Sequence, residues 1–418
     1  MPKPLQRKSW GKQRMGSLSL TTYKALNRSA KAAHQDPYKE RPSGPLIWAV
    51  VHDDANARAV LYLLDRMRML RGPCNLLLTY IEKPPYVPRR KGVLSCVLPI
   101  DTTEASRAFL EHWQPSYCLW FGGELRPVLV EQAHERAVPM SLLSASDTLL
   151  DQPIWRWLPS LARETLNAFN KISAKDAGGQ RILRKMDGAR RAVSIDGLLQ
   201  ETVLPPSVNE SVFDEVSRDL NGRPVWLAAD VQEDELATVL QAHRESIRIA
   251  HRLILILVAA TFPISVEART VLKSQGWRVC YWEDGDPIEE ETQIIFVEEP
   301  EEMGLWFRAS PFCFLGSTLS AGHGGNDPYV PASLGSAIIY GPNVGRFTSS
   351  FSRLAAAGAA RIIKDTEGLS RAIVQLLAAD QAASMAHAAW VTISEGAEVT
   401  DAVIDDIQEH WDALESNG

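Results

Sequence analysis

The feature that most constrains the fold of this chain is a regular alternation of short apolar runs with longer helical stretches. The alternation occurs in two series, which begin with the apolar runs 46–51 and 224–229. Strands that alternate with helices form right-handed βαβ units, and such units build parallel sheets covered by helices on both faces. The polar, proline-containing stretch 205–223 separates the two series. The sequence therefore predicts an α/β fold of two Rossmann-like domains, 41–204 and 224–418, joined by a linker, with ligands bound in a cleft between them.

Within this pattern, the expected strands are short and apolar, and the expected helices are longer and amphipathic. We expect strands at 46–51, 74–79, 93–98, 116–121, 138–143, 224–229, 252–258, 277–282, 292–297, 312–315 and 337–340. We expect helices at 55–70, 103–113, 126–137, 366–379, 381–391 and 403–414. No internal repeat is visible in the sequence.

The composition narrows the class of protein. A chain of 418 residues is long enough for two domains with sizeable cores. Its net charge of −7 gives no overall basic field, which argues against nucleic acid as a partner. The five cysteines have no CxxC spacing, as is typical of reduced core residues in a cytoplasmic protein. The longest apolar run, 253–260, is far shorter than the roughly 20 residues that span a membrane.

The first forty residues differ from the rest of the chain, because residues 1–35 carry eight Lys and Arg residues and the first acidic residue is Asp36. Leu18, Leu20, Tyr23 and Leu26 fall on one face of a short predicted helix. A basic amphipathic segment suits an anionic membrane surface. The alternative is a basic tail with one helix docked on the protein, and both interpretations stay open.

The segment 314–342 places a glycine-rich loop between an apolar strand and a helix start. Glycine has no Cβ, so its backbone N–H groups can approach a phosphate that side chains would exclude. The helix start near Pro331 adds the partial positive charge of a helix N-terminus. We interpret the segment as a phosphate site; the alternative is an ordinary glycine-rich surface loop. The candidate phosphate-binding residues are Gly316, Ser317, Thr318, Gly324, Gly325 and Asn326.

The same segment resembles the C-terminal motif of the 3-deoxy-D-manno-octulosonic acid (Kdo) transferases. That motif reads F-x-G-G-S-L, a short gap, G-G-H-N-P-x-E-P-A-A-L-G and a strand ending in G-P. The stretch 302–306, EMGLW, resembles another segment of the family. The positions that match the motif are Gly316, Gly324, Gly325, Pro328, Pro331, Ala332, Leu334, Gly335, Gly341 and Pro342.

The resemblance implies a glycosyltransferase of the GT-B type, which has two Rossmann-like domains facing a cleft. It implies transfer of Kdo from CMP-Kdo to a lipid A precursor in lipopolysaccharide core biosynthesis, with no metal and no other cofactor. Such enzymes work at the cytoplasmic face of the inner membrane. Family members usually carry an apolar N-terminal anchor, and no such segment is found in this sequence, so we expect any attachment to be peripheral.

The family's general base is a glutamate just after the first strand, and Asn56 occupies its position here. An amide cannot accept a proton at neutral pH. Asp53 or Asp54, on the same turn, could act as the base instead. Alternatively, one of these two aspartates only caps the helix that begins at Ala55.

A second family segment, E-T-E-L-W-P-N, is thought to face the acceptor and aligns with 122–128. Glu124 and Pro127 match the family, while the first glutamate and the tryptophan are replaced. We expect Glu124 to contact a polar acceptor. The alternative is that Glu124 is an acidic residue at a helix start, where the helix dipole favours it.

In the second domain, several donor contacts of the family are missing. The family's P-R-H, whose arginine binds the donor phosphate, corresponds to Ala-Ala-Thr at 259–261. An arginine makes charge-assisted, bidentate phosphate contacts that these residues cannot make. The glutamate that binds the nucleotide ribose corresponds to Val330, and S-T-H corresponds to 230–232, although Glu235 is retained. His323 either replaces the motif's histidine after a one-residue shift or faces solvent.

Three functions remain open on the sequence. The first is a Kdo transferase with a CMP-sugar donor, a lipid A precursor acceptor and peripheral contact with an anionic membrane. The second is a diverged paralogue that acts as a binding or partner protein with weak or no catalysis. The combined loss of the base, the phosphate arginine and the ribose glutamate favours this second function. The third is an epimerase or another sugar-nucleotide enzyme with two Rossmann-like domains, for which no specific motif is present.

Overall fold

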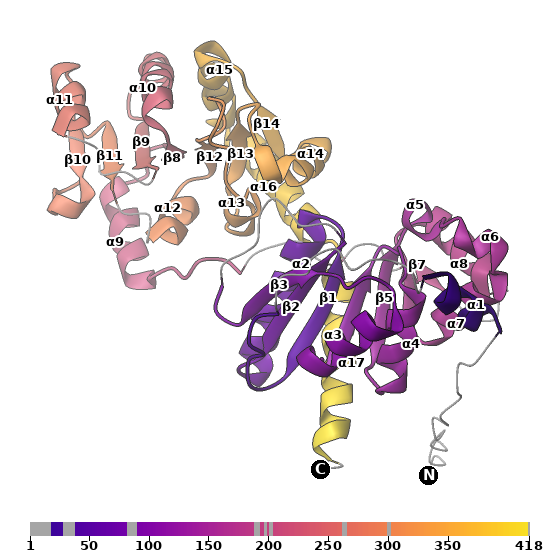
Figure 1. Ribbon diagram of the computed structural model, residues 1–418. Helices are drawn as coiled ribbons and strands as arrows, with labels where there is room; N and C mark the ends of the chain where they lie inside the picture. The colour runs from indigo at the N-terminus through magenta and orange to yellow at the C-terminus, as the bar shows by residue number, and fades with distance from the viewer. Residues whose placement is uncertain are drawn as a thin grey trace, which may run out of the picture. The chain divides into compact units, whose positions relative to one another are not determined.

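The computed structural model describes residues 18–27, 38–81, 90–187, 193–195, 199, 204–260, 266–298 and 302–416. The chain divides into two compact units, with 1–201 and 396–418 in unit 1 and 202–395 in unit 2 (Figure 1). Each unit contains a seven-stranded sheet whose pairings are all parallel. The predicted α/β fold with two Rossmann-like halves is therefore confirmed.

Unit 1 has the strand order β3-β2-β1-β4-β5-β6-β7. Every residue of β1, β4 and β5 is buried, because helices cover both faces of a parallel sheet. The strands are β1 (Leu46–Val51), β2 (Asn75–Tyr80), β3 (Val93–Val97), β4 (Tyr117–Phe121), β5 (Met140–Ala145), β6 (Lys171–Ala174) and β7 (Ser194–Ile195). The helices are α1 (Leu18–Asn27), α2 (Asp54–Arg71), α3 (Thr103–Trp113), α4 (Pro127–Glu135), α5 (Asp147–Leu150), α6 (Ile154–Trp157), α7 (Pro159–Asn167), α8 (Ala177–Asp187) and α17 (Ala397–Glu415).

Unit 2 has the strand order β10-β11-β9-β8-β12-β13-β14. The strands are β8 (Val225–Val231), β9 (Ile254–Ala259), β10 (Val279–Tyr281), β11 (Ile294–Val297), β12 (Phe312–Leu315), β13 (Ala337–Tyr340) and β14 (Ala360–Ile362). The helices are α9 (Glu210–Leu220), α10 (Glu233–Ser246), α11 (Val266–Ser274), α12 (Met303–Ala309), α13 (Tyr329–Ser333), α14 (Thr348–Ala356), α15 (Thr366–Leu376) and α16 (Ala379–Ser394), with short 3₁₀ turns at Trp282–Asp284 and Gly345–Phe347.

Both sheets reverse their strand order beside their first strand. In unit 1, β1 lies between β2 and β4, and in unit 2, β8 lies between β9 and β12. Parallel α/β sheets bind ligands where the order reverses, just outside the carboxyl ends of the two strands. The loops that follow β1 and β4 in unit 1, and β8 and β12 in unit 2, therefore hold the candidate sites.

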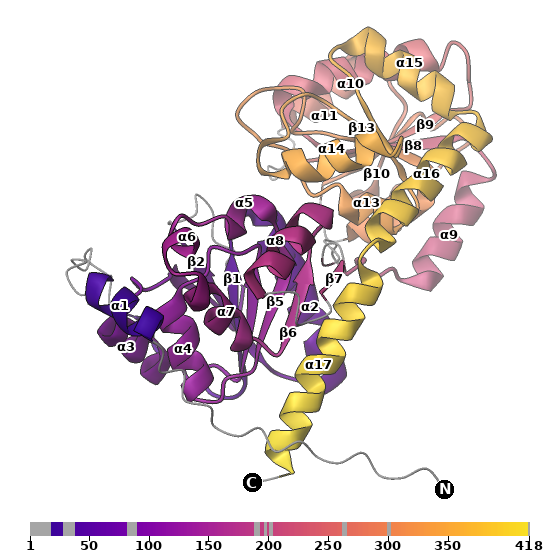
Figure 2. The same cartoon turned by 90° about the vertical axis from the view of Figure 1, so that its right-hand side faces the viewer.

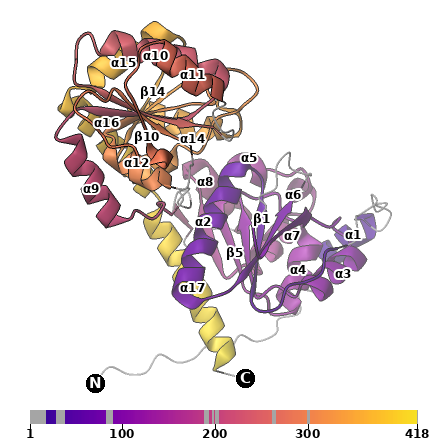
Figure 3. The ribbon, with the colours of Figure 1, turned by 90° about the vertical axis from the view of Figure 1, so that its left-hand side faces the viewer.

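The last helix belongs to unit 1, whereas the sequence placed residues 396–418 in the second domain. α17 packs along α2 (Figures 2 and 3), and Ile404, Ile407 and Trp411 are buried in the core that contains α2 and β1. Arg66 pairs with Asp401 at 2.9 Å. The amphipathic pattern of 403–414 predicted a helix correctly, but it does not say which core the helix covers.

The stretch 205–223, expected as a linker, contains the helix α9. Val216 and Leu220 of α9 are buried in a core of unit 2, and Arg308 of α12 pairs with Glu210 at 2.6 Å. Asn209 caps the helix by accepting a hydrogen bond from the backbone N–H of Ser211. The second unit therefore begins before the boundary expected at residue 224.

Candidate functional site

The glycine loop of unit 2 begins where β12 ends, against the turn that follows β8. A Cβ at position 316 would lie 2.5 Å from the carbonyl oxygen of Asp230, so only glycine allows this approach. Ser317 and Asp230 both have left-handed backbones, with φ of +59° and +54°. The two turns are therefore packed backbone to backbone at the switch point of the sheet.

The carboxylate of Glu235 fills the space between these turns. Glu235 lies in the first turn of α10 and is buried. It accepts hydrogen bonds from the backbone N–H groups of Ser317 at 2.6 Å, Thr318 at 2.9 Å and Leu319 at 2.7 Å. It also accepts one from the N–H of Gln232 at 3.1 Å, within a capping box. An internal carboxylate therefore occupies the anion-binding nest that these N–H groups form.

This arrangement corrects part of the predicted phosphate site. The N–H groups of Ser317 and Thr318 donate to Glu235, so they are not available to a bound phosphate. The hydroxyl of Thr318 is also used, because it donates to the carbonyl of Leu315 at 2.6 Å and accepts from the N–H of Gly341 at 2.7 Å. These two residues hold the loop in shape.

The bend 322–326 is the part of the loop that remains for a ligand. The N–H of Gly325 donates to the carbonyl of Ser317 at 2.9 Å. The N–H of Gly324, a residue with φ of +81°, meets no acceptor within the described parts of the chain. The side chain of Asn326 donates to Asp230, whose pKa is raised by burial and lowered by this bond. His323 Nε2 lies 3.7 Å from Asp234 Oδ2 at the rim.

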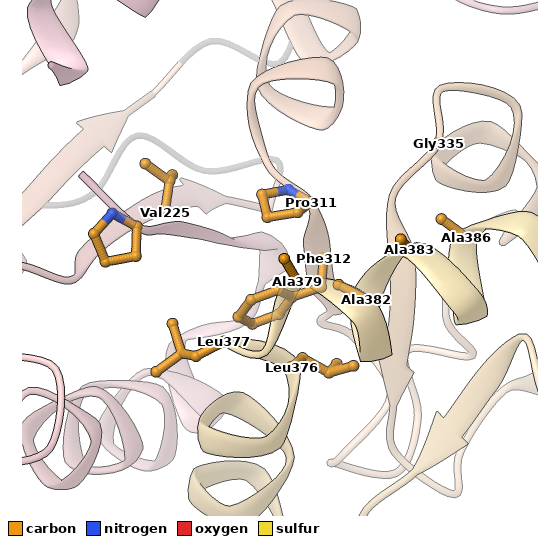
Figure 4. A pocket seen from close by; sticks show the side chains of 11 residues that line it. Val225, Pro311, Phe312, Gly335, Leu376, Leu377, Ala379, Ala382, Ala383 and Ala386 are labelled. Carbon is orange, nitrogen blue, oxygen red and sulfur yellow. The ribbon is translucent and has the colours of Figure 1, made fainter. Parts of the chain in front are cut away.

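Unit 2 also contains an apolar cavity of about 530 Å³ (Figure 4). Val225 and Phe312 line it at the beginnings of β8 and β12, and Ala382, Ala383 and Ala386 line it from α16. It lies at the amino ends of these strands, at the edge of the sheet opposite the glycine loop. The cavity is therefore separate from the switch point.

In unit 1, Asp53 follows β1 and caps α2. Its carboxylate accepts a hydrogen bond from the backbone N–H of Asn56 at 2.7 Å. The capping role that the sequence left open for the aspartates is thus filled by Asp53. Asp54 begins α2 and lies near Tyr80 at the end of β2, where burial and this negative charge together raise the tyrosine pKa to about 12. Asn56 lies in the first turn of the same helix.

Glu124 ends a tight turn after β4. Gly122, Gly123 and Glu124 have φ of +75°, +132° and +48° in succession. Glutamate does not readily adopt a left-handed backbone, so the surrounding structure must hold it there. Trp120 Nε1 donates to the carbonyl of Gly123 at 2.8 Å, and the N–H of Ser146 donates to the carbonyl of Gly122 at 2.8 Å.

His52 lies beside this turn, although the sequence did not single it out as a site residue. Val50 pairs with Trp120 in the sheet, so His52 lies level with Gly122. Its Nδ1 is 3.9 Å from Glu124 Oε2. Burial lowers the pKa of His52, and the Glu124 carboxylate and the carbonyls of Gly123 and Phe121 oppose that effect. Its Nε2 is buried and has no hydrogen-bond partner among the described residues.

Comparison with known proteins finds similarity to one family of enzymes. A family model described as 3-deoxy-D-manno-octulosonic-acid transferase (kdotransferase) matches residues 26–200. The 3-deoxy-D-manno-octulosonic acid transferase of Haemophilus influenzae is 22% identical over 68% of this chain and 67% of its own length. The enzyme of the same name from Bordetella pertussis is 27% identical over 72% of this chain and 71% of its own length. These matches support membership of this chain in the Kdo transferase family, and with it a glycosyltransferase activity.

Two solved structures are also similar to the chain. The C-terminal CMP-Kdo binding domain of WaaA from Acinetobacter baumannii has a TM-score of 0.35 and 18% identity, and covers 49% of this chain and 99% of that one. MurG from the same organism has a TM-score of 0.45 and 13% identity, and covers 88% of this chain and 100% of that one.

The structure locates most of the positions at which this chain departs from the motifs of the Kdo transferases. Ala260 is buried directly after β9, and its N–H donates to the carbonyl of Val231 at 3.0 Å. Thr261 lies outside the described residues. Val330 is half-buried in α13. Within the described ranges, no group of three or more His, Cys, Asp or Glu side chains is arranged to hold a metal ion.

The N-terminal helix α1 is docked on unit 1. Leu20 is buried, Ser19 contacts Ser160 of α7, and Lys24 pairs with Glu131 of α4. Tyr23 donates to the buried carboxylate of Asp101, and burial raises the pKa of that carboxyl to about 6. The docked-helix alternative therefore holds for α1, while the basic residues of 1–17 lie outside the described ranges. No helix in the described ranges has both the length and the apolar character that crossing a bilayer requires.

Proposed function

We propose that this chain transfers Kdo from CMP-Kdo to a lipid A precursor in lipopolysaccharide core biosynthesis. The observation that carries the proposal is the loop 316–326, which matches the family motif and follows β12 at the switch point of unit 2. Ligands of doubly wound sheets bind at that point. Family membership supports the donor sugar, because the relatives are Kdo transferases by name.

In this proposal the donor phosphate lies against the bend 322–326. The N–H of Gly324 has no acceptor among the described residues and can bind an anion, and Asn326 borders the same bend. Gly316, Ser317, Thr318 and Gly325 shape the loop, since their N–H groups or close packing are already used within the protein. The chain supplies orientation and charge stabilisation, which is most of what glycosyl transfer asks of a protein.

We also propose that unit 1 contacts an anionic membrane surface at the cytoplasmic face of the inner membrane, where a lipid acceptor would be found. Leu18 and Trp157 are 88% and 82% exposed. The helix α1 contacts Ser160, three residues after Trp157, so the two exposed side chains belong to the same region of unit 1. Arg156 lies next to Trp157 and is also exposed. Exposed apolar side chains with neighbouring basic residues suit the interface of an anionic bilayer, and the basic stretch 1–17 adds positive charge to the same end of the chain.

A second candidate function is a binding or partner protein that has lost catalysis. The observation that favours it is the occupation of the N–H groups of Ser317 and Thr318 by Glu235, together with the use of Asp53 as a helix cap. In such a protein the scaffold of the donor site persists and its ligand contacts do not.

Calorimetry with CMP and CMP-Kdo separates the two functions. We expect the wild-type chain to bind both ligands, and Gly324→Trp to abolish binding because the indole fills the bend. Gly358→Trp is the matched control, since Gly358 also has a left-handed φ, of +73°, and a Cβ placed there would have no neighbour within 4 Å. Transfer to a lipid A precursor is then measured for the wild type. Failure of the wild type to bind at millimolar ligand would reject the transferase and favour the partner protein.

Vesicle sedimentation tests the membrane contact. We expect the full chain to bind phosphatidylglycerol vesicles, to release them at high salt, and to bind more weakly after Trp157→Ala or removal of residues 1–17. Met69→Ala, another exposed apolar position in unit 1, is the control and should bind like the wild type. Equal binding by all variants would contradict the proposed surface.

A further inference from the structure

Three carboxylates lie at the switch point of unit 1, and the structure gives each a different environment. Asp53 accepts the N–H of Asn56 as a helix cap. Asp54 begins α2 and lies close enough to Tyr80 to raise that tyrosine's pKa. Glu124 accepts no hydrogen bond within the described part of the chain, and its side chain is 39% exposed. Asp54 also accepts none within the described residues, but Glu124 is the one of the three whose carboxylate lies 3.9 Å from a histidine nitrogen, Nδ1 of His52.

The backbone of Glu124 is held in place at a cost in energy. A left-handed conformation costs a residue with a Cβ about 1 kcal/mol or more. Two hydrogen bonds to the preceding glycines fix the turn. The indole N–H of Trp120 donates to the carbonyl of Gly123, and the backbone N–H of Ser146 donates to the carbonyl of Gly122. Strained residues that are this strongly fixed are concentrated at functional sites. The strain therefore points to a role for the direction of the Glu124 side chain.

His52 supports the carboxylate from the side of β1. Its side chain is 12% exposed, and its Nδ1 lies 3.9 Å from Glu124 Oε2. The charged groups that face His52 are Glu124 and Asp53, and burial outweighs both and lowers the histidine pKa. The ring is thus neutral at neutral pH and places no positive charge beside Glu124.

We propose that Glu124 is the general base of the transfer reaction and that His52 is its positioning residue. This inference rests on the proposed transferase function. The acceptor hydroxyl gives its proton to a carboxylate oxygen of Glu124, and its oxygen forms a bond to the anomeric carbon of the donor sugar. The bond between that carbon and the phosphate oxygen breaks, and its electron pair leaves with CMP. The proton on Glu124 then passes to solvent.

The proposal explains how the chain tolerates Asn56. The family's base lies after the first strand, and Glu124 lies after the neighbouring strand, β4. Because β1 and β4 are in register, with Val50 opposite Trp120, both turns border the same crevice. In this chain the base therefore lies on the turn after β4, on the other side of that crevice from the family's position after β1.

The first test compares acidic residues of unit 1 in a transfer assay with CMP-Kdo and a lipid A precursor. We expect Glu124→Gln to lower kcat by about 100-fold or more, the usual contribution of a general base, with unchanged CMP-Kdo affinity. Glu104→Gln, an exposed glutamate at the start of α3, is the control and should match the wild type. Two results would overturn the inference while leaving the transferase function intact. One is full activity of Glu124→Gln, and the other is a loss of kcat of this size in Asp53→Asn or Asp54→Asn but not in Glu124→Gln. A wild type that transfers nothing would reject both.

The second test is the pH profile of His52→Gln. In the wild type, protonation of His52 at acidic pH gives Glu124 a cationic neighbour and lowers its basicity, so kcat falls. Without the imidazole, we expect the acidic limb of kcat to move to lower pH, with kcat reduced about tenfold and KM unchanged. An acidic limb at the wild-type position would show that the histidine only fills space.

Discussion

Glu235 in unit 2 and Glu124 in unit 1 both lie beside the switch points of their sheets, yet their surroundings are opposite. Glu235 is buried and accepts hydrogen bonds from four backbone N–H groups. Glu124 is partly exposed, accepts none within the described residues and has a left-handed backbone. One carboxylate stabilises the fold and leaves no charge for a ligand, whereas the other weakens the fold and keeps its charge available. The carboxylate beside the switch point of unit 2 thus serves the structure, and we propose that the one beside the switch point of unit 1 serves the chemistry.

The largest effect is expected from Glu235→Ala. The substitution leaves buried N–H groups at Ser317, Thr318 and Leu319 without an acceptor, which we expect to cost about 3 to 5 kcal/mol of unfolding free energy. Urea unfolding measures the loss, and Asp234→Ala, at the exposed neighbouring position, is the control. Inorganic phosphate should restore part of the stability of Glu235→Ala, because the emptied nest can bind it. A loss below about 1 kcal/mol would mean that water replaces the carboxylate.

Asp101 tests whether the number of hydrogen-bond donors decides how well a buried carboxylate stabilises the fold. It is buried like Glu235, but within the described ranges it accepts from only two backbone N–H groups, of Val128 at 3.3 Å and Leu129 at 3.0 Å, and from one side chain, Tyr23. Burial raises its pKa to about 6, so its stabilising contribution is present below about pH 4 and is lost as the pH rises through 6. That loss amounts to roughly 3 kcal/mol for a shift of about two pH units.

The measurement is urea unfolding of wild type and Asp101→Asn from pH 4 to pH 8. We expect the wild type to lose stability across this range more steeply than the variant, whose amide does not ionise. Parallel curves for the two proteins would show that Asp101 keeps a carboxylate's ordinary pKa despite its burial. The small number of hydrogen-bond donors around Asp101 would then have no effect on how it stabilises the fold.

The smallest effect is expected from Glu124→Gly. Glycine accepts a left-handed backbone without strain, so the variant should be about 1 kcal/mol more stable than the wild type while losing transfer activity. Gln114→Gly is a matched control, because Gln114 also has a positive φ, of +41°, but lies at the end of α3. It should gain similar stability and keep its activity. A less stable Glu124→Gly would indicate that the glutamate side chain contributes to the fold.

The strands that position these sites could be predicted from the sequence, because their buried apolar residues follow one another without interruption. β1 and β9 are uninterrupted apolar runs, and each is buried along its whole length. The strands β6, β7 and β14 were not predicted, since they are only two to four residues long and lack such runs.

The contacts between distant turns were not predictable in the same way. Glu235 and Ser317 are 82 positions apart, and nothing near either residue indicates that one accepts a hydrogen bond from the other. The proximity of His52 and Glu124 depends on the pairing of β1 with β4. The sequence did identify Glu124, Asp53 and the glycine loop as candidates through the family motifs, and their roles remain proposals.

The return of α17 to unit 1 has a consequence for how the protein is made. Val403, Ile404, Ile407 and Trp411 complete a core whose other buried side chains lie between residues 47 and 199. During synthesis from the N-terminus, the ribosome releases residues 202–395 before these side chains emerge, so the second unit can close while the first still has an open face. The half that is translated first is therefore completed after the second, and a nascent chain must keep that face from aggregating until α17 has been made.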